Sequence, residues 1–293
     1  MIALLLNSGL GSRMGDETKV HPKCMTKITG TETIISWQVK LLERIGVTEA
    51  VVTTGHLSAM LEDYLLSLDT PIRFHFVHNP RYRETNYIYS MYLAKELLAG
   101  HDVLSLHGDL VMHPAVMDKL AASPVSAVTV DTTLPLPEKD FKGRIRKGRL
   151  MEVGVNVFGP TLHARSAWTE GNLPDRAKWV EDPCVELQPA YRILARDFDR
   201  WMQEISRFIA EGNDRVYAEN AFNAAWEEIP VYPLDVQGLL CAEIDNQEDR
   251  AAVCARFANE VGHCPTNAAH CTQWASVAKT GVSQSWPIKE VQS

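Results

Sequence analysis

Residues 2–15 read IALLLNSGLGSRMG, and residues 21–25 read HPKCM. The apolar run at the start has the length of a β-strand, and it leads into a loop with two glycines, Gly9 and Gly11. Because glycine has no side chain, the backbone N–H groups of such a loop can turn toward an anion. Arg13 and Lys23 add fixed positive charge for a polyphosphate. This stretch therefore predicts a phosphate-binding loop at the carboxyl end of a strand.

The loop differs from the two best-known phosphate-binding loops. Lys23 is not preceded by glycine, as a P-loop lysine is, and Met14 stands where a dinucleotide fingerprint has its third glycine. A Gly-x-Gly pair alone is equally consistent with a plain tight turn. With the preceding strand, Arg13 and the Pro22-Lys23 pair, however, the stretch resembles the signature of nucleotidyltransferases, the enzymes that make activated sugars and cytidylyl-activated alcohols.

The composition is that of a globular protein with an acidic balance. Its 293 residues are 45% hydrophobic and 23% charged, with a formal net charge of −8, and a chain of this length can bury a substantial core. No basic stripe is present, so a nucleic-acid partner is not expected. Six scattered cysteines are typical of reduced thiols, and no apolar segment is long enough to span a membrane. We expect a cytoplasmic protein without membrane insertion, and a homodimer is left open.

Strand-like and helix-like segments alternate at short intervals through about residue 130. The expected strands are 2–6, 50–55, 73–77, 102–106 and 125–130, and the expected helices are 33–45, 58–68, 86–98 and 113–120. This alternation predicts an α/β fold with a doubly wound, mostly parallel, Rossmann-like sheet. Polar residues at the ends of the strands, such as Thr54, Asn79 and Asp109, should line one crevice, because ligands bind outside the carboxyl ends of parallel strands.

Beyond residue 130 the pattern predicts a smaller part of different character. Residues 134–142 are expected to form a proline-broken loop, 149–158 strands, and 159–189 irregular structure. Helices are expected at 198–209, 217–226 and 247–261, and strands at 231–236 and 239–244. We therefore expect one nucleotidyltransferase domain over 1–261, in which about 131–230 is a smaller substrate-binding insertion. Residues 262–293 lose periodicity and are expected to be a C-terminal extension.

Two acidic motifs could hold a divalent cation. Asp109 follows a buried-looking strand, and Glu243 and Asp245 lie on the same side of a later strand. An isolated Asp at such a position more often caps a helix, but the second acidic pair favours a shared site, because Mg²⁺ prefers hard oxygen ligands. The pairs His263-Cys264 and His270-Cys271 also suggest zinc, although their spacing matches no familiar zinc motif.

Three motifs together resemble those of the bacterial phosphocholine cytidylyltransferase family: the Gly-x-Gly-x-Arg loop, Gly-Asp at 108–109 and Glu-x-Asp-Asn at 243–246. The stretch NPRYRETNYIYS at 79–90 also matches, and the resemblance covers roughly 1–260. It implies CTP as the nucleotide and Mg²⁺ as the cofactor, with Asp109, Glu243 and Asp245 as metal ligands. It further implies that Arg13 and Lys23 are catalytic residues on the triphosphate. The implied nucleotide-binding residues are Leu6, Asn7, Ser8, Gly9, Gly11, Ser12, Thr54, Asn79 and Asp109.

The acceptor is less clearly indicated than the nucleotide. Residues 7–15, 134–142 and 217–222 look closer to 2-aminoethylphosphonate cytidylyltransferases, whereas 159–186 does not match that subgroup. Choline carries no N–H and needs an aromatic cage, whereas a primary ammonium donates three hydrogen bonds and needs carboxylates or carbonyls. The aromatic residues that could build a cage, if they are not core residues, are Tyr82, Tyr87, Tyr89, Trp168 and Trp179.

We expect the primary amine, and the expected acceptor-binding residues are Asn86, Tyr89, Asp131, Lys139, Lys142 and Glu219. Glu219 and Asp131, with Asp140 as a weaker candidate, would receive the ammonium, and the two lysines would hold the phosphonate oxygens. The predicted reaction joins CTP and 2-aminoethylphosphonate to give the CMP-activated phosphonate and pyrophosphate by direct in-line attack. Phosphocholine is the alternative acceptor, and a catalytically silent nucleotide-binding module is the alternative outside enzymes.

Overall fold

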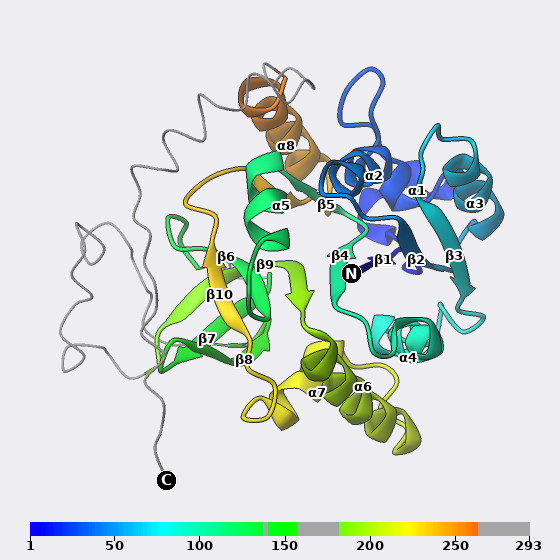
Figure 1. Cartoon of the computed structure of the whole chain (residues 1–293). Coiled ribbons are helices and arrows are strands. Elements are labelled where there is room, and N and C mark those ends of the chain that lie inside the picture. Colours follow the sequence, from blue (N-terminus) through cyan, green and yellow to red (C-terminus); the bar gives the residue numbers. More distant parts are fainter. Residues whose placement is uncertain (137–139, 158–181, 263–293) are drawn as a thin grey trace, which may run out of the picture.

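The computed structural model describes residues 1–136, 140–157 and 182–262 (Figure 1). Its main sheet consists of β1 (Ile2–Leu6), β2 (Glu49–Thr54), β3 (Arg73–His78), β4 (Val103–His107), β6 (Ala127–Asp131), β7 (Lys142–Arg146), β8 (Arg149–Gly154), β9 (Cys184–Ile193) and β10 (Tyr232–Asp235). A separate ribbon pairs β5 (Leu110–Met112) with β11 (Cys241–Glu243). The predicted extension and its zinc pairs lie outside the described residues, as do Lys139, Trp168 and Trp179.

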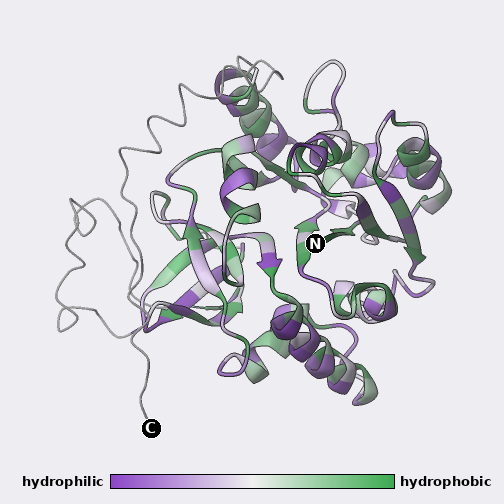
Figure 2. Cartoon of the chain, in the orientation of Figure 1, coloured by the Kyte–Doolittle hydropathy of each residue, from purple (hydrophilic) through white to green (hydrophobic). Residues whose placement is uncertain are grey.

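Helices cover the main sheet on both faces. They are α1 (Glu17–Val20), α2 (Ile34–Arg44), α3 (Ser58–Leu66), α4 (Tyr87–Leu98), α5 (Pro114–Ala121), α6 (Ala195–Ala210), α7 (Ala218–Ala225) and α8 (Gln247–Glu260). One buried apolar cluster joins α2, α3, α5 and α8 to the sheet, and a second joins α4, α6 and α7 to it. In Figure 2 the inner strands are mostly green, whereas α6 carries purple residues on its outer side. This two-sided covering confirms the expected α/β class.

The first four strands pair as predicted. β1 runs parallel to β2 on one side and to β4 on the other, and β3 continues the sheet beyond β2. Two of the helices between them begin at a side-chain cap: Thr33 accepts a hydrogen bond from the Ser36 backbone at the start of α2, and Asn86 caps α4. All four carboxyl ends therefore meet at one edge of the sheet.

The second half departs from the expectation of irregular structure up to residue 189. β9 is a ten-residue strand that pairs antiparallel with β4, β6 and β7. Pro189 is tolerated because the β6–β9 register shifts between Val128 and Thr129, so the proline falls in a bulge. Neither β5 nor β7 was predicted, and the first residue of β7, Lys142, was expected to end a loop. Otherwise the expected elements are present, with ends that differ by a few residues.

In the part of the chain that the structure describes, no helix is long and apolar enough to cross a lipid bilayer. The four cysteines found there, Cys24, Cys184, Cys241 and Cys254, are all free, as expected for reduced thiols.

Candidate active site

The loop after β1 passes between two glycines that follow the neighbouring strands. β2 is followed by Gly55, and β4 is followed by Gly108. A Cβ on Gly108 would lie 2.0 Å from Oδ1 of Asn7, and a Cβ on Gly55 would lie 2.4 Å from the carbonyl oxygen of Ser8. Only glycine leaves room for the loop at both places. The crevice expected at the strand ends is therefore built from three adjacent strands.

The loop then turns onto Lys23. Gly11 has a φ of 64°, in the left-handed region, and leads into the short 3₁₀ helix η1 (Ser12–Met14). A Cβ on Gly11 would lie 2.9 Å from Cβ of Lys23, and the hydroxyl of Thr18 donates to the Gly11 carbonyl at 3.1 Å. The second glycine of the motif is thus needed for the close approach of the loop to the lysine stem.

Lys23 joins two carboxylates that lie far apart in the sequence. Its Nζ is 2.6 Å from Oδ2 of Asp109 and 2.5 Å from Oδ1 of Asp245, and Arg13 lies 2.6 Å from the other oxygen of Asp245. Burial lowers the pKa of Lys23, but the two carboxylates more than offset this and raise its pKa above the ordinary value. The structure therefore brings both predicted catalytic cations and two predicted metal ligands into one cluster.

The turn that carries Asp109 is held from behind by α2. The buried side chain of Gln38 donates Nε2 to the carbonyl oxygens of His107 and Leu110, both at 2.8 Å. The backbone N–H of Gly108 donates to the Leu6 carbonyl at 3.0 Å. These bonds fix both sides of the Gly108–Asp109 turn. Sequence reasoning missed Gln38, because a glutamine on a helix carries no signal of the turn that it supports.

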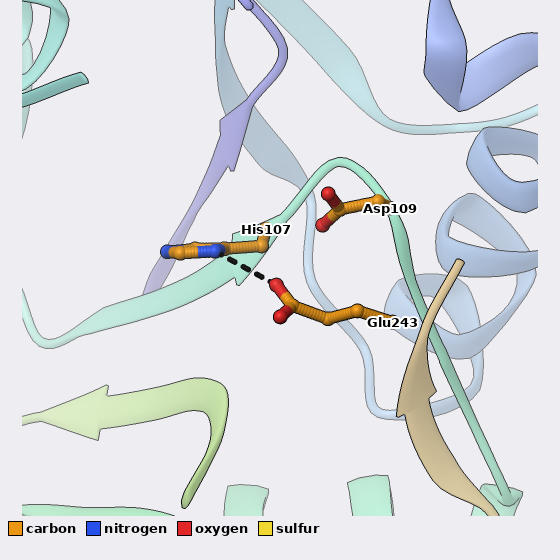
Figure 3. A group of neighbouring side chains, drawn as sticks. All are labelled: His107, Asp109 and Glu243. Carbon is orange, nitrogen blue, oxygen red and sulfur yellow. Dashed lines mark hydrogen bonds and ion pairs between the residues drawn. The ribbon is translucent and has the colours of Figure 1, made fainter. Parts of the chain in front are cut away.

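A second group lies on the other side of Asp109 (Figure 3). Donor atoms of His107, Asp109 and Glu243 all lie within 4.8 Å of one another. Nδ1 of His107 is 3.1 Å from Oε1 of Glu243. Burial and the charge of Asp109 raise the pKa of Glu243 to about 7. Burial lowers the pKa of His107, but Glu243, followed by Asp109, more than offsets this and raises it to about 8.

Asp109 therefore links two groups of predicted metal ligands, since its Oδ2 contacts Lys23 while it also lies beside His107 and Glu243. Asp109 and Glu243 belong to the group with His107, whereas Asp245 is bound to Lys23 and Arg13. Oδ1 of Asp109 is buried and has no hydrogen-bond partner within 1–136, 140–157 and 182–262. An orphaned carboxylate oxygen beside a second carboxylate fits a hard divalent cation. His107 was not predicted, although its place two residues before Asp109 was a usable signal.

The remaining residues predicted for the nucleotide surround the same loop. The Ser8 hydroxyl lies 2.7 Å from the Ser90 hydroxyl. The Ser90 hydroxyl also accepts a hydrogen bond from Nδ2 of Asn79 at 3.0 Å. Thr54 donates to Glu62 at 3.2 Å. These partners position the backbone at the ends of β1, β2 and β3 rather than leaving the side chains free. The side-chain amide of Asn7 is buried, and neither its nitrogen nor its oxygen has a partner.

On the acceptor side, Glu219 lies beneath two tyrosines. Its side chain is buried, and it accepts hydrogen bonds from the hydroxyls of Tyr87 and Tyr191, the latter at 2.9 Å. The Tyr87 ring packs edge-on against His107 with centroids 5.0 Å apart, so Glu219 is linked to the His107 group through one ring. The rings of Phe141 and Tyr217 pack edge to face beside them, with centroids 4.9 Å apart.

The other acceptor candidates on α4 are engaged elsewhere. Asn86 accepts a hydrogen bond from the Tyr87 backbone at 2.7 Å and so caps the helix. The Tyr89 ring lies under the guanidinium of Arg81, 5.1 Å from its centroid, and Tyr82 lies near His56. Of the described tyrosines proposed for a cage, the structure brings only Tyr87 to Glu219.

Asp131 and Lys142 flank a third carboxylate, Glu186. In the β9 pairings, Glu186 lies opposite Asp131 of β6 and opposite Lys142 of β7. Asp131 accepts hydrogen bonds from the Thr133 backbone and hydroxyl, at 2.8 and 2.6 Å. Burial, followed by the charges of Asp131 and Asp140, raises the pKa of Glu186 to about 7. Lys142 is 1% exposed, so its side chain is buried where β7 packs in the fold.

Glu186 should make stability depend on pH. Its folded pKa of about 7 exceeds the ordinary 4.5, so folding favours the protonated carboxyl. The contribution of Glu186 to the free energy of unfolding is therefore full below pH 4.5 and is lost as the pH rises toward 7. We expect Glu186→Gln to be more stable than the parent at pH 8 but not at pH 5, by urea midpoint. The exposed Glu96→Gln is the matched control and should leave both midpoints unchanged. An equal effect of Glu186→Gln at both pH values would contradict the assignment.

Comparison with known proteins gives consistent results. Residues 3–135 match the family model of the MobA-like NTP transferase domain. The chain is 37% identical over 134 residues to a CMP-5'-(3-aminopropyl)phosphonate synthase from Streptomyces rubellomurinus, a match covering 46% of this chain and 21% of that protein. It is 30% identical over 172 residues to a choline-phosphate cytidylyltransferase from Haemophilus influenzae, a match covering 58% of this chain and 69% of that protein. The chain spans about half or less of the curated relatives that match most strongly.

A solved structure has the same fold. The CTP:phosphocholine cytidylyltransferase from Streptococcus pneumoniae superposes with a TM-score of 0.65 at 19% identity, over 87% of this chain and 98% of that one. The chain has a loop after its first strand, followed by a lysine and a cluster of carboxylates at the strand ends. Together with the relatives above, these features define it as a nucleotidyltransferase. The chain belongs to the family of the MobA-like NTP transferase domain.

Proposed function

We propose that the protein is a cytidylyltransferase that joins CTP and 2-aminoethylphosphonate to give CMP-2-aminoethylphosphonate and pyrophosphate. The observation that carries the proposal is the cluster in which Lys23 and Arg13 face Asp109 and Asp245 at the end of β1. The names of the relatives support CTP as the nucleotide and a small phosphonate or phosphate ester as the acceptor.

The reaction follows from charge. A phosphonate oxygen attacks the α-phosphorus of CTP, a new P–O bond forms, the α–β phosphoanhydride bond breaks, and pyrophosphate leaves with the electron pair. The attacking oxygen is already anionic, so no general base is required. Lys23 and Arg13 neutralise the departing pyrophosphate, and the loop after β1 holds the nucleotide in line. A divalent cation such as Mg²⁺, held by Asp109 and Glu243, would supply further neutralisation at the phosphates.

The ammonium group of the acceptor is assigned to the side of the site that carries Glu219. This carboxylate is buried and accepts a hydrogen bond from Tyr87, whose ring packs edge-on against His107. A buried negative charge favours a cation, and the tyrosine hydroxyls that cover it can accept N–H groups. Asp131 is the second candidate. The predicted roles of Asn86, Tyr89 and Lys142 stay proposals.

Phosphocholine is the second candidate acceptor, because a set of rings lies at the same place. Tyr87, Phe141 and Tyr217 pack around one another, with Tyr87–Tyr217 centroids 5.9 Å apart. Rings in this arrangement can attract a quaternary ammonium group without hydrogen bonds.

The test is release of pyrophosphate from CTP and Mg²⁺ with each acceptor at matched concentration. We expect 2-aminoethylphosphonate to be preferred, and we expect Glu219→Gln to raise KM for it roughly 10-fold or more, because the buried negative charge that attracts the ammonium is removed. KM for CTP should stay unchanged, and Glu96→Gln serves as the control. Preference for phosphocholine would overturn the choice of acceptor. The absence of turnover with either compound would contradict both proposed acceptors.

A further inference from the structure

The imidazole of His107 faces two carboxylates, and donor atoms of all three side chains lie within 4.8 Å of one another. His107 and Asp109 stand two residues apart at the end of β4, and Glu243 reaches them from β11 (Figure 3). Glu243 pairs in register with Leu110, and the Ile244 backbone donates to the Asp109 carbonyl at 3.0 Å. The three side chains therefore come from backbone segments that hydrogen bonds hold in place.

Each of the three donors has an atom directed into the cluster. Nδ1 of His107 points at Glu243, and the edge-on contact with Tyr87 holds the ring in this orientation. Lys23 contacts Asp109 through Oδ2, whereas the buried Oδ1 accepts no hydrogen bond from the residues that the structure describes. A cation bound there would take the place of the proton that Nδ1 shares with Glu243, and it would satisfy the orphaned oxygen.

We propose that His107 is a ligand of the divalent cation together with Asp109 and Glu243, and that this nitrogen ligand makes the site prefer Mn²⁺ over Mg²⁺. Mg²⁺ is matched to oxygen ligands and binds imidazole poorly, whereas imidazole suits first-row transition metals. The proposal rests on the proposed metal-dependent function and specifies the metal for the same site. The predicted role of Asp245 as a further ligand stays a proposal; in the structure its two oxygens contact Lys23 and Arg13.

The test measures metal binding to the full chain without nucleotide or acceptor. Isothermal titration with Mn²⁺ and with Mg²⁺ gives both affinities for the parent and for His107→Gln, whose amide oxygen keeps a hard ligand. We expect the variant to lose at least about 10-fold in Mn²⁺ affinity, and the Mg²⁺ affinity to change by less than about threefold. His75→Gln is the matched control, because His75 also faces a carboxylate, Glu49, but at the surface. It should change neither affinity.

A spectroscopic measurement makes the result independent of the variant's folding. Pulsed electron paramagnetic resonance of the parent with Mn²⁺ should show the coupling of a directly bound imidazole nitrogen, and His107→Gln should lack it. Absence of that coupling in the parent, or equal losses for both metals in the variant, would overturn the proposal and leave His107 as a residue that positions Glu243. Neither readout depends on turnover, so failure of the proposed cytidylyltransferase activity would be recognised separately.

Discussion

Lys23→Ala is expected to lower turnover by roughly 10²-fold or more, in line with the loss of one electrostatic stabiliser of a transition state. Lys23 is the cation that is placed deepest in the site: its side chain is 14% exposed, against 68% for Arg13. Its Nζ contacts both Asp109 and Asp245, so it stands where phosphate and metal charges must be balanced. The measurement is kcat for pyrophosphate release at saturating CTP and acceptor.

The control for this prediction is Lys19→Ala. Lys19 lies in the same segment, but it is 75% exposed and pairs only with Asp16 at the surface, so its loss should leave kcat unchanged. Thermal unfolding of both variants separates a loss of chemistry from a loss of folded protein. A folded Lys23→Ala protein with near-normal turnover would contradict the catalytic role.

Gly108→Ala is expected to damage stability and activity together. The new Cβ would lie 2.0 Å from Oδ1 of Asn7 and 2.8 Å from the carbonyl oxygen of Leu6. The second atom belongs to the backbone of β1, so the clash cannot be relieved by a side-chain rotation alone. We expect a loss of about 3 kcal/mol in the free energy of unfolding. Because Asp109 is the next residue, a displacement of about 1 Å would also reduce turnover roughly 10²-fold.

Gly30→Ala makes the same chemical change where a Cβ would meet nothing within 4 Å, so it should alter neither stability nor kcat. Urea denaturation gives the free energies, and pyrophosphate release gives kcat. Wild-type stability in Gly108→Ala would mean that the loop after β1 can move away from β4, and the proposed cradle would then be wrong.

The parallel half of the fold could be predicted because its signals are local. Apolar runs such as Ile2–Leu6 alternate with helices, two of which begin at a side-chain cap, as α2 does at Thr33. β9 could not be predicted in the same way. Pro189 argues against a strand, and only the bulge opposite β6 makes it acceptable. That bulge depends on pairing with a partner about 60 residues away, which no local pattern records.

The candidate site was predictable in its residue types and not in its contacts. Arg13, Lys23, Asp109 and Asp245 were expected in one crevice, and the structure brings them together. The direct contact of Lys23 with both carboxylates depends on side-chain packing between segments up to 222 positions apart. His107 was missed for the same reason, since its meaning depends on Glu243, which reaches it from β11.

The position of β9 has a consequence for the chain during synthesis. β4 and β6 never pair with each other, because both pair with β9, which is complete only at Ile193. In a nascent chain that has emerged only to residue 136, the edges of β4 and β6 that pair with β9 are therefore open, and such edges are sites for aggregation. A fragment cut to the family match, residues 3–135, would keep those edges permanently. The shortest fragment with a closed central sheet must extend through Ile193.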